Sequence, residues 1–377
     1  MTVLGILARE IPRLLRLKVF ITTRPERHIR NELAKYETHE QFCLQDIEQS
    51  VVEADIRLYL GSRLSQEEVR QALPELPLPP WQPTPQQMDT LVHMSGKLFI
   101  IAATAATFIL DGKRLAPKEQ LEILLSGLSP RDSSGSRHTF LDNMYLQILR
   151  APCPEQASPW IGRFQVIVGA ITLLQESLPC NALAELIGIY VSDIATMLSN
   201  LHSLFAPGAK DQIFRIHHKS FPDFITDPNR REHSCQFYID RAAHHLRIAK
   251  CCLIVMNSNL GRHRNLHEWN KDLAQHHCQQ GVISPHLTYV CAYWASHLVL
   301  AAEIKNTSAP DDRVKQLLER FASQHISAWI DVLGRIRGIN PIHFGVSGIM
   351  VCIVLYVLSG EQKYSPELRY STTLSNA

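Results

Sequence analysis

The segment FRIHHKSFPDFITD, Phe214 to Asp227, carries the features that decide how the second half of the chain is interpreted. Its first residues predict a short strand, and its last residues predict a helix. We expect Phe221 and Phe224 to pack in a core and His217 and His218 to lie at its edge. An alternative is that His218 lies at a domain junction and donates a hydrogen bond to a phosphate.

Three predicted helices precede this segment, and their apolar residues recur at helical spacing. They are IGRFQVIVGAITLLQ, CNALAELIGI and VSDIATMLSNLHSLF, followed by QIFRIHH as a short strand. Three helices with a strand pair are the composition of a winged helix. We therefore expect residues 151–235 to form a winged-helix domain, with its core between Trp160 and Asp227.

Amphipathic helices continue beyond this domain and predict a helical scaffold over residues 236–340. The segments are HHLRIAKCCLIVMNSNL, ISPHLTYVCAYWASHLVLAA and DDRVKQLLERFASQHISAWIDVLGRI. No clean internal repeat is visible, which argues against a regular solenoid.

A further helical domain is predicted upstream, over residues 46–150. DIRLYLGSRL predicts a helix with Asp55 as N-cap and with Ile56, Tyr59 and Leu60 on one face. A proline-rich break over 73–87 predicts a linker or extended loop. LVHMSGKLFIIAATAATFILDG then predicts one helix of about twenty residues, for which burial is favoured over a membrane span. FLDNMYLQILR predicts another helix, which ends near a proline-bounded boundary.

The first 45 residues predict one α/β unit without the rest of its sheet. Leu4, Leu7, Ile11, Leu14 and Leu15 share one face of a predicted helix, and KVFIT follows as a strand that Pro25 ends. A lone strand cannot satisfy its edges, so the first domain is expected to lack its beginning. Arg24, fixed by the following proline, is well built for bidentate phosphate contact, although most such arginines are solvated.

Composition narrows the function classes. The charged side chains of the 377 residues nearly cancel, to a net charge of +2, so nucleic acid is a weak expectation. Nine cysteines without a secretory leader predict reduced thiols and a cytoplasmic protein. PIHFGVSGIMVCIVLYVLSG, within the apolar segment and polar tail of residues 341–377, is expected to be a buried helix, with a tail anchor as the alternative.

Several kinds of chemistry have no support in the sequence. There is no GxxxxGK[ST] loop, since Gly96-Lys97 has Leu91 where the leading glycine should stand and Leu98 after the lysine. No apolar strand ends in paired carboxylates that could hold Mg²⁺. The sequence is rich in histidine and cysteine at positions that fit no structural zinc spacing, namely His233, Cys235, His244, His245, Cys251 and Cys252. No cysteine lies where a strand-to-helix turn would activate a thiolate.

The order of several segments resembles the NACHT-type NTPases of the STAND class, which are found in large numbers in fungi. The segments are FITTRPE, EADIRLYL, SGKLFIIAATAATFI, LDNMYLQIL, HHKSFPDFITD and YVCAYWASHL. The resemblance extends roughly from Leu4 to Leu333. It implies a mainly α chain in which residues 1–45 are the remnant of an α/β P-loop core.

The resemblance also implies roles for two residues. Arg24, at the end of the strand, corresponds to a sensor that approaches the γ-phosphate, and His218 corresponds to a histidine that contacts the β-phosphate of ADP. ATP or ADP with Mg²⁺ would be the ligands of a full-length relative. The chain departs from the family pattern because it lacks the Walker A and Walker B elements and the repeat sensor.

Three hypotheses follow. The first is a partial signalling switch, of the kind used in non-self recognition or programmed cell death, without independent ATP hydrolysis. The second is a helical interaction protein that binds and modulates full-length relatives. The third is DNA binding through the winged helix, which Asp223 and Asp227 disfavour because they interrupt the basic residues. A membrane is a partner only through residues 341–360.

Overall fold

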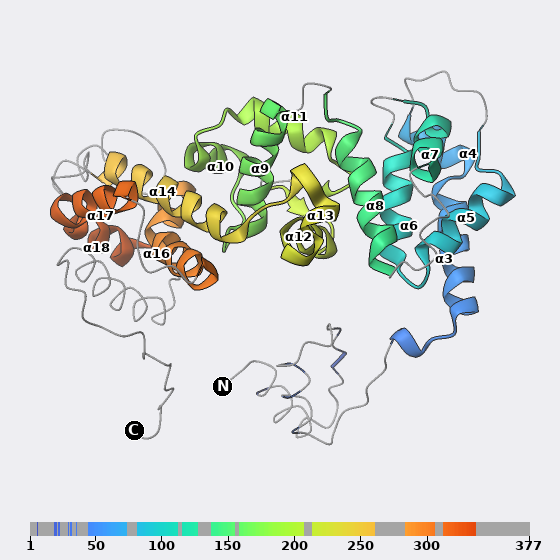
Figure 1. Ribbon diagram of the computed structural model, residues 1–377, viewed down its shortest axis with the longest axis horizontal. Helices are drawn as coiled ribbons and strands as arrows, with labels where there is room; N and C mark the ends of the chain where they lie inside the picture. Colours follow the sequence, from blue (N-terminus) through green and yellow to red (C-terminus); the bar gives the residue numbers. More distant parts are fainter. Residues whose placement is uncertain are drawn as a thin grey trace.

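The computed structural model describes residues 44–73, 81–111, 115–126, 137–154, 158–206, 213–260, 283–305 and 312–336, together with a few isolated positions before Leu44. Within these ranges the chain is mainly helical, and its sheet is one pair of short strands. The helices follow one another along the long axis in three groups, α3 to α8, α9 to α13 and α14 to α18 (Figure 1). The mainly α prediction is confirmed.

The predicted strand over 18–22 is not observed at its described positions. Val19, Phe20 and Thr22 are outside any strand, and the side chain of Phe20 is 88% exposed. An isolated strand has no neighbour to satisfy its backbone groups, which is the physical reason why such a segment does not persist as one. Arg24 and the apolar stretch over 341–360 lie outside the described residues.

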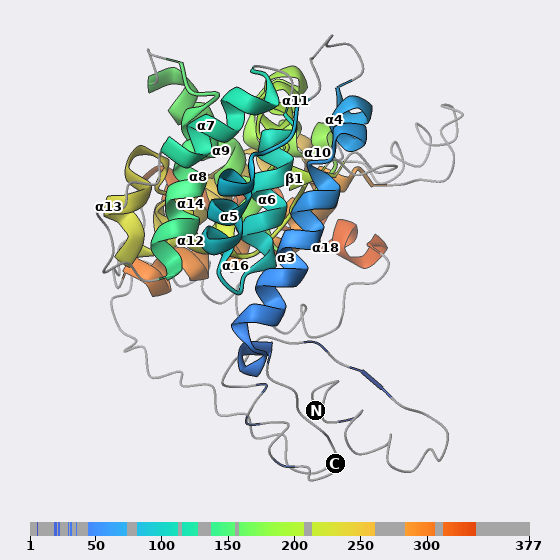
Figure 2. The ribbon, with the colours of Figure 1, turned by 90° about the vertical axis from the view of Figure 1, so that its right-hand side faces the viewer.

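The first group packs into a helical unit. Its elements are a 3-10 turn at Leu44–Asp46, α3 (Gln49–Arg63), α4 (Gln66–Ala72), α5 (Pro85–Ser95), α6 (Phe99–Ile109), α7 (Pro117–Ser126) and α8 (Arg137–Arg150). The helices α3, α5 and α6 lie next to one another (Figure 2), and α7 and α8 pack against α6. The core includes Ile56 and Leu60 of α3, as the sequence predicted, while Tyr59 is half-buried.

Two predicted boundaries in this group are wrong. Asp55 is not an N-cap, because α3 begins six residues earlier, at Gln49. The proline-rich break is shorter than predicted, because Pro85 and Gln87 belong to α5. Thr84 caps this helix by accepting from the backbone N–H of Gln87, whose side chain bonds back to Thr84 N. Proline is well tolerated in a first helical turn, where its missing N–H is not needed.

The single long helix predicted over 91–112 is two helices. Gly96 separates α5 from α6 with φ of 54°, a left-handed backbone angle that glycine adopts without strain. The second half, α6, is buried on most of its surface, so burial of this apolar run is confirmed. With 11 residues it is about half the length that a membrane-spanning helix needs.

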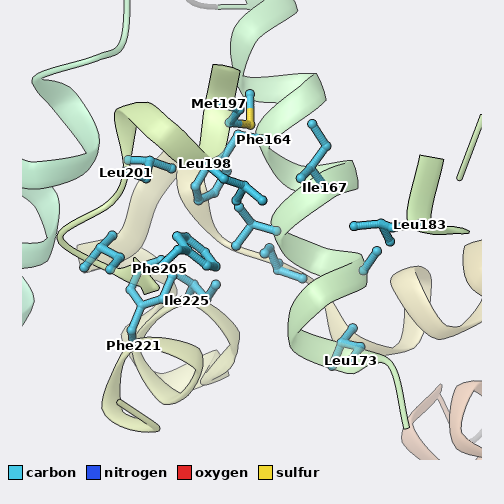
Figure 3. Close-up of a cluster of buried hydrophobic side chains, with 14 of the residues drawn as sticks. Phe164, Ile167, Leu173, Leu183, Met197, Leu198, Leu201, Phe205, Phe221 and Ile225 are labelled. Carbon is cyan, nitrogen blue, oxygen red and sulfur yellow. The ribbon is translucent and has the colours of Figure 1, made fainter. Parts of the chain in front are cut away.

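The central group is built around a shared aromatic and aliphatic core. Its elements are α9 (Ser158–Leu173), α10 (Cys180–Ile187), α11 (Val191–Asn200), β1 (Phe205–Ala206), β2 (Arg215–Ile216), α12 (Ser220–Thr226), a 3-10 turn at Pro228–Arg230, α13 (Arg231–Ser234) and a 3-10 turn at Cys235–Phe237. Phe205 and Phe221 meet edge to face beside Leu198 and Leu201 (Figure 3). Phe221 and Phe224 are 1% and 0% exposed, which confirms the core that FRIHHKSFPDFITD predicted.

The strand predicted from QIFRIHH is shorter than expected. Among its described residues, from Ile213 onward, Arg215 and Ile216 pair in antiparallel register with Ala206 and Phe205. The three predicted helices before it are observed as α9, α10 and α11.

The C-terminal group consists of α14 (Arg241–Asn259), α16 (Pro285–Lys305), α17 (Asp312–Gln324) and α18 (Ile326–Arg335). The last predicted helix is therefore two helices that meet at His325. Trp294, Phe321 and Trp329 form an aromatic cluster with ring centroids 5.3 to 6.2 Å apart, which fastens α16 to α17 and α18.

The C-terminal group meets the central group where α14 crosses α9. The ring of His244 lies so close to Gly169 that an added Cβ would be 2.4 Å from its Cδ2 atom. A glycine is therefore required for this approach of the two helices.

In the described part of the chain, no single helix is long and apolar enough to cross a membrane. The helices α10 and α11 would meet the length and composition criteria together, but they are bent by 116°.

Candidate functional site

The contact between α8 and the start of α12 brings together side chains that are 75 residues apart. The hydroxyl of Tyr145, on α8, lies 2.7 Å from the Oγ atom of Ser220. Ser220 Oγ in turn lies 2.6 Å from Nδ1 of His218. Tyr145 itself is 1% exposed and packs against Phe221 and Phe224, so apolar contacts fix the position of its hydroxyl.

The hydrogen bonds around His218 define its tautomer. The backbone N–H of Ser220 donates to His218 Nδ1 at 3.2 Å, and a backbone N–H can only donate. Nδ1 therefore carries no proton, and the neutral imidazole has its proton on Nε2. It follows that the Ser220 hydroxyl also donates to Nδ1 and accepts from the Tyr145 hydroxyl. Burial raises the pKa of Tyr145 to about 12, so this hydroxyl keeps its proton at neutral pH.

A charged pair lies one helical turn from Tyr145. Asp142, three residues before it on α8, accepts from the guanidinium of Arg230 at 3.2 Å. Arg230 Nε also lies 3.6 Å from Asp227. The side chains of Asp142 and Arg230 are 5% and 18% exposed, so this pair is held largely away from water.

A second polar contact joins the first group to the central group. Asp111, after α6, places Oδ2 3.5 Å from Nδ1 of His202, after α11. His217 Nε2 lies 3.1 Å from the backbone oxygen of His202, to which it can only donate. We use the name polar junction for the side chains that connect these groups: Asp111, Asp142, Tyr145, His202, His218, Ser220 and Arg230. The polar junction contains His218, whose ring proton is on Nε2.

The residues predicted to contact nucleotide have different outcomes. His218 is half-buried and belongs to the polar junction. Arg24 lies outside the described residues, so its predicted role stays a prediction. Lys97, in the segment that fails the phosphate-loop pattern, donates to the backbone oxygen of Ile47.

The two adjacent histidines that could suggest a metal, His244 and His245, contact different helices. His244 Nε2 lies 2.9 Å from the backbone oxygen of Gln165 on α9, whereas His245 Nδ1 lies 2.8 Å from His297 on α16. Cys251 is half-buried and Cys252 is fully buried. Across the residues that the structure describes, no group of three or more histidine, cysteine or acidic side chains could hold a metal ion.

A second network was missed by the sequence analysis. The backbone N–H of Gln175, after α9, donates to the Tyr289 hydroxyl at 3.0 Å, and that hydroxyl lies 2.7 Å from His297 Nε2. His297 Nδ1 lies 2.8 Å from His245 Nδ1. We call these four residues the buried histidine chain. The sequence signal was weak: Tyr289 and His297 are eight residues apart and so share a face of α16.

In the buried histidine chain, one set of directions gives every proton an acceptor. The Tyr289 oxygen accepts from the Gln175 N–H and its own proton is directed to His297 Nε2, so the proton of the neutral His297 ring is on Nδ1. His297 Nδ1–H then donates to His245 Nδ1, which leaves the His245 proton on Nε2. Burial lowers the pKa of His245 to about 4 and that of His297 to about 3, with nearby positive charge as a further cause. Both rings are therefore neutral at pH 7.

No protein-family model, curated protein or solved structure matches the chain. The assignment of a function therefore depends on the geometry of the two networks and on the sequence segments described above.

Proposed function

We propose that the chain is a partial signalling switch module of the NACHT type, from the STAND class of NTPases. The observation that supports this most is the position of His218, the histidine of its H-x-S-F-x-D-F motif, in the polar junction. It is bonded through Ser220 to Tyr145 of the preceding helical group. The Nε2–H of this tautomer is the kind of donor from which a phosphate oxygen accepts. The family resemblance implies that this phosphate is the β-phosphate of ADP.

In this proposal the central group is the winged-helix domain of residues 151–235, and residues 1–45 are the end of a nucleotide-binding core. A phosphate at His218 Nε2 changes the charge that Nδ1 presents to Ser220, and Ser220 passes this change to Tyr145 on α8. The orientation of the two helical groups is thereby coupled to the ligand, which is the usual design of a nucleotide switch. The chain does not hydrolyse ATP alone, because it has no GxxxxGK[ST] loop. It acts in the cytoplasm with full-length relatives that supply the loop and Mg²⁺.

The test is a titration of the full chain with ADP, followed through the imidazole carbon–proton resonances. We expect the His218 resonance to shift at millimolar ADP but not with adenosine, because the contact is to phosphate. His218→Gln identifies the resonance, and His217→Gln serves as the matched control on the adjacent residue. Absence of a shift at His218 would contradict its role. Binding of ADP with micromolar affinity would contradict the proposal that the nucleotide site is incomplete.

A second function, as a helical interaction protein that modulates full-length relatives, is favoured by a different observation. Tyr190 and Val191, at the start of α11, are 81% and 40% exposed. Exposed tyrosines are enriched among the residues that carry binding energy at protein interfaces. Under this function Tyr190→Ala abolishes co-purification with an intact relative, whereas Ile330→Ala, at a 53% exposed position on α18, does not. Equal capture by both variants would reject it.

A further inference from the structure

The buried histidine chain joins α14 and α16 of the C-terminal group to the end of α9, through ring side chains that are almost fully enclosed. His245 on α14 and His297 on α16 are 2% and 0% exposed, and Tyr289 is 2% exposed. Their ring centroids are 5.1 Å apart for the two histidines and 6.1 Å apart for Tyr289 and His297. The helices that carry them, α14 and α16, pack along their lengths (Figure 1).

The Nδ1 atoms of His245 and His297 face each other at 2.8 Å, so only one of these two nitrogens can carry a proton. If His245 takes up a proton on Nδ1, the Nδ1–H of His297 must move to Nε2 to avoid two donors facing each other. Nε2–H then donates to the Tyr289 oxygen, which already accepts from Gln175. The Tyr289 hydroxyl proton thereby loses its acceptor in the chain. Each extra proton therefore costs a hydrogen bond as well as the burial of a charge.

The groups that face the chain do not favour a positive charge. On α14 these are Arg241, His244 and the Cys252 thiol. Burial raises the pKa of Cys252, so its thiol stays neutral. On α16 Tyr293 adds its hydroxyl, which donates to Glu176 after α9. The carboxylate of Glu176 is thus already engaged.

We propose that the buried histidine chain is an acid-sensitive latch, which holds α14 to α16 and to the end of α9 while both imidazoles are neutral. Uptake of one proton releases it, so mildly acidic conditions loosen the C-terminal group before the rest of the molecule. This inference is independent of the proposed nucleotide switch, because none of its residues belongs to the polar junction.

The test is hydrogen exchange of the full chain at pH 7.5 and at pH 5.5, with protection corrected for the intrinsic rates. We expect peptides from α14 and α16 to lose about tenfold in protection at pH 5.5 for each of the two histidines that opening exposes, with α5 and α6 as the internal reference. The double variant His245→Asn with His297→Gln, which cannot be protonated here, should lose this pH dependence. His217→Gln, at an exposed histidine, should keep it.

Equal loss of protection in the wild type and the double variant would overturn the proposal. If the double variant does not fold, imidazole resonances of the wild type decide instead. Titration of His245 and His297 well below pH 6.5, together with loss of protection in α14 and α16, supports the latch. Titration of either ring near pH 6.5 with protection unchanged overturns it.

Discussion

The polar junction and the buried histidine chain use the same kinds of side chain, a tyrosine hydroxyl and histidine rings, in different surroundings. In the buried histidine chain, the backbone N–H of Gln175 begins a series of hydrogen bonds in which every proton has an acceptor, and the rings are enclosed. In the polar junction, His218 is only half-buried, its Nδ1 accepts from Ser220, and its ring proton is on Nε2. An enclosed network stabilises one protonation state, whereas a partly open network can exchange a partner without losing the fold.

The largest effect expected from the enclosed network is the loss of stability in acid. Because the folded pKa values of His245 and His297 are about 4 and about 3, the unfolded chain binds more protons below its pKa of about 6.5. The contribution of the two neutral histidines to the free energy of unfolding is therefore fully present above pH 6.5, and it is lost as the pH falls toward 4. At pH 5 the loss should be about 2 kcal/mol for each histidine. Urea denaturation at pH 7.5 and pH 5 measures this loss. An equal free energy of unfolding at the two pH values would show that His245 and His297 are not enclosed.

Each network contains a tyrosine hydroxyl that a phenylalanine substitution removes. The larger effect is expected for Tyr289, in the buried histidine chain. Tyr289→Phe deletes the hydroxyl that accepts from Gln175 N–H and donates to His297 Nε2, so the buried His297 ring and the backbone N–H of Gln175 each lose a partner. We expect a loss of about 1 to 3 kcal/mol in the free energy of unfolding. Urea denaturation at pH 7.5 measures it, with Tyr190→Phe, at an 81% exposed tyrosine, as control. A change no larger than that of the control would show that water replaces the hydroxyl.

The sequence predicts the networks less well than it predicts the helices that carry them. Hydrophobic spacing was enough to place Phe221 and Phe224 in the core, because burial of one face is a local property of a helix. The break at Gly96 was missed although Ser95, Gly96 and Lys97 interrupt the apolar residues there, because helical spacing of the apolar residues on both sides was given more weight than this interruption. Helix type and core side chains were thus accessible from the sequence, while helix ends were not.

The hydrogen-bonded partners could not be predicted because they are distant in sequence. His245 and His297 are 52 residues apart, and Tyr145 and Ser220 are 75 residues apart. Only packing of the helices determines which of the many histidines meet. His218 was singled out by its motif, but its partner Tyr145 was seen only as part of an amphipathic helix.

The charged pair of the polar junction should contribute less than the enclosed tyrosine. Asp142→Asn keeps the shape of the side chain but removes the charge that faces Arg230, which retains Asp227 nearby. We expect a loss of about 1 kcal/mol, because the side-chain oxygen of asparagine can still accept from Arg230 and the carboxylate of Asp227 remains near the guanidinium. Urea denaturation at low and moderate salt measures it. The control is Asp193→Asn, whose carboxylate lies 3.8 Å from Arg163 in an exposed pair and should have almost no effect.

Tyr145→Phe is expected to have the smallest effect on stability and the most specific effect on His218. The phenyl ring keeps its contacts with Phe221 and Phe224, and only the bond to Ser220 is lost. The free energy of unfolding should fall by about 0.5 to 1 kcal/mol. The Ser220 hydroxyl still donates to His218 Nδ1, so the tautomer should remain Nε2–H, which nitrogen chemical shifts of the imidazole report. A change of tautomer would show that Tyr145, rather than the backbone N–H of Ser220, sets the proton position of His218. A tyrosine hydroxyl would then orient a histidine in the polar junction, as Tyr289 does in the buried histidine chain.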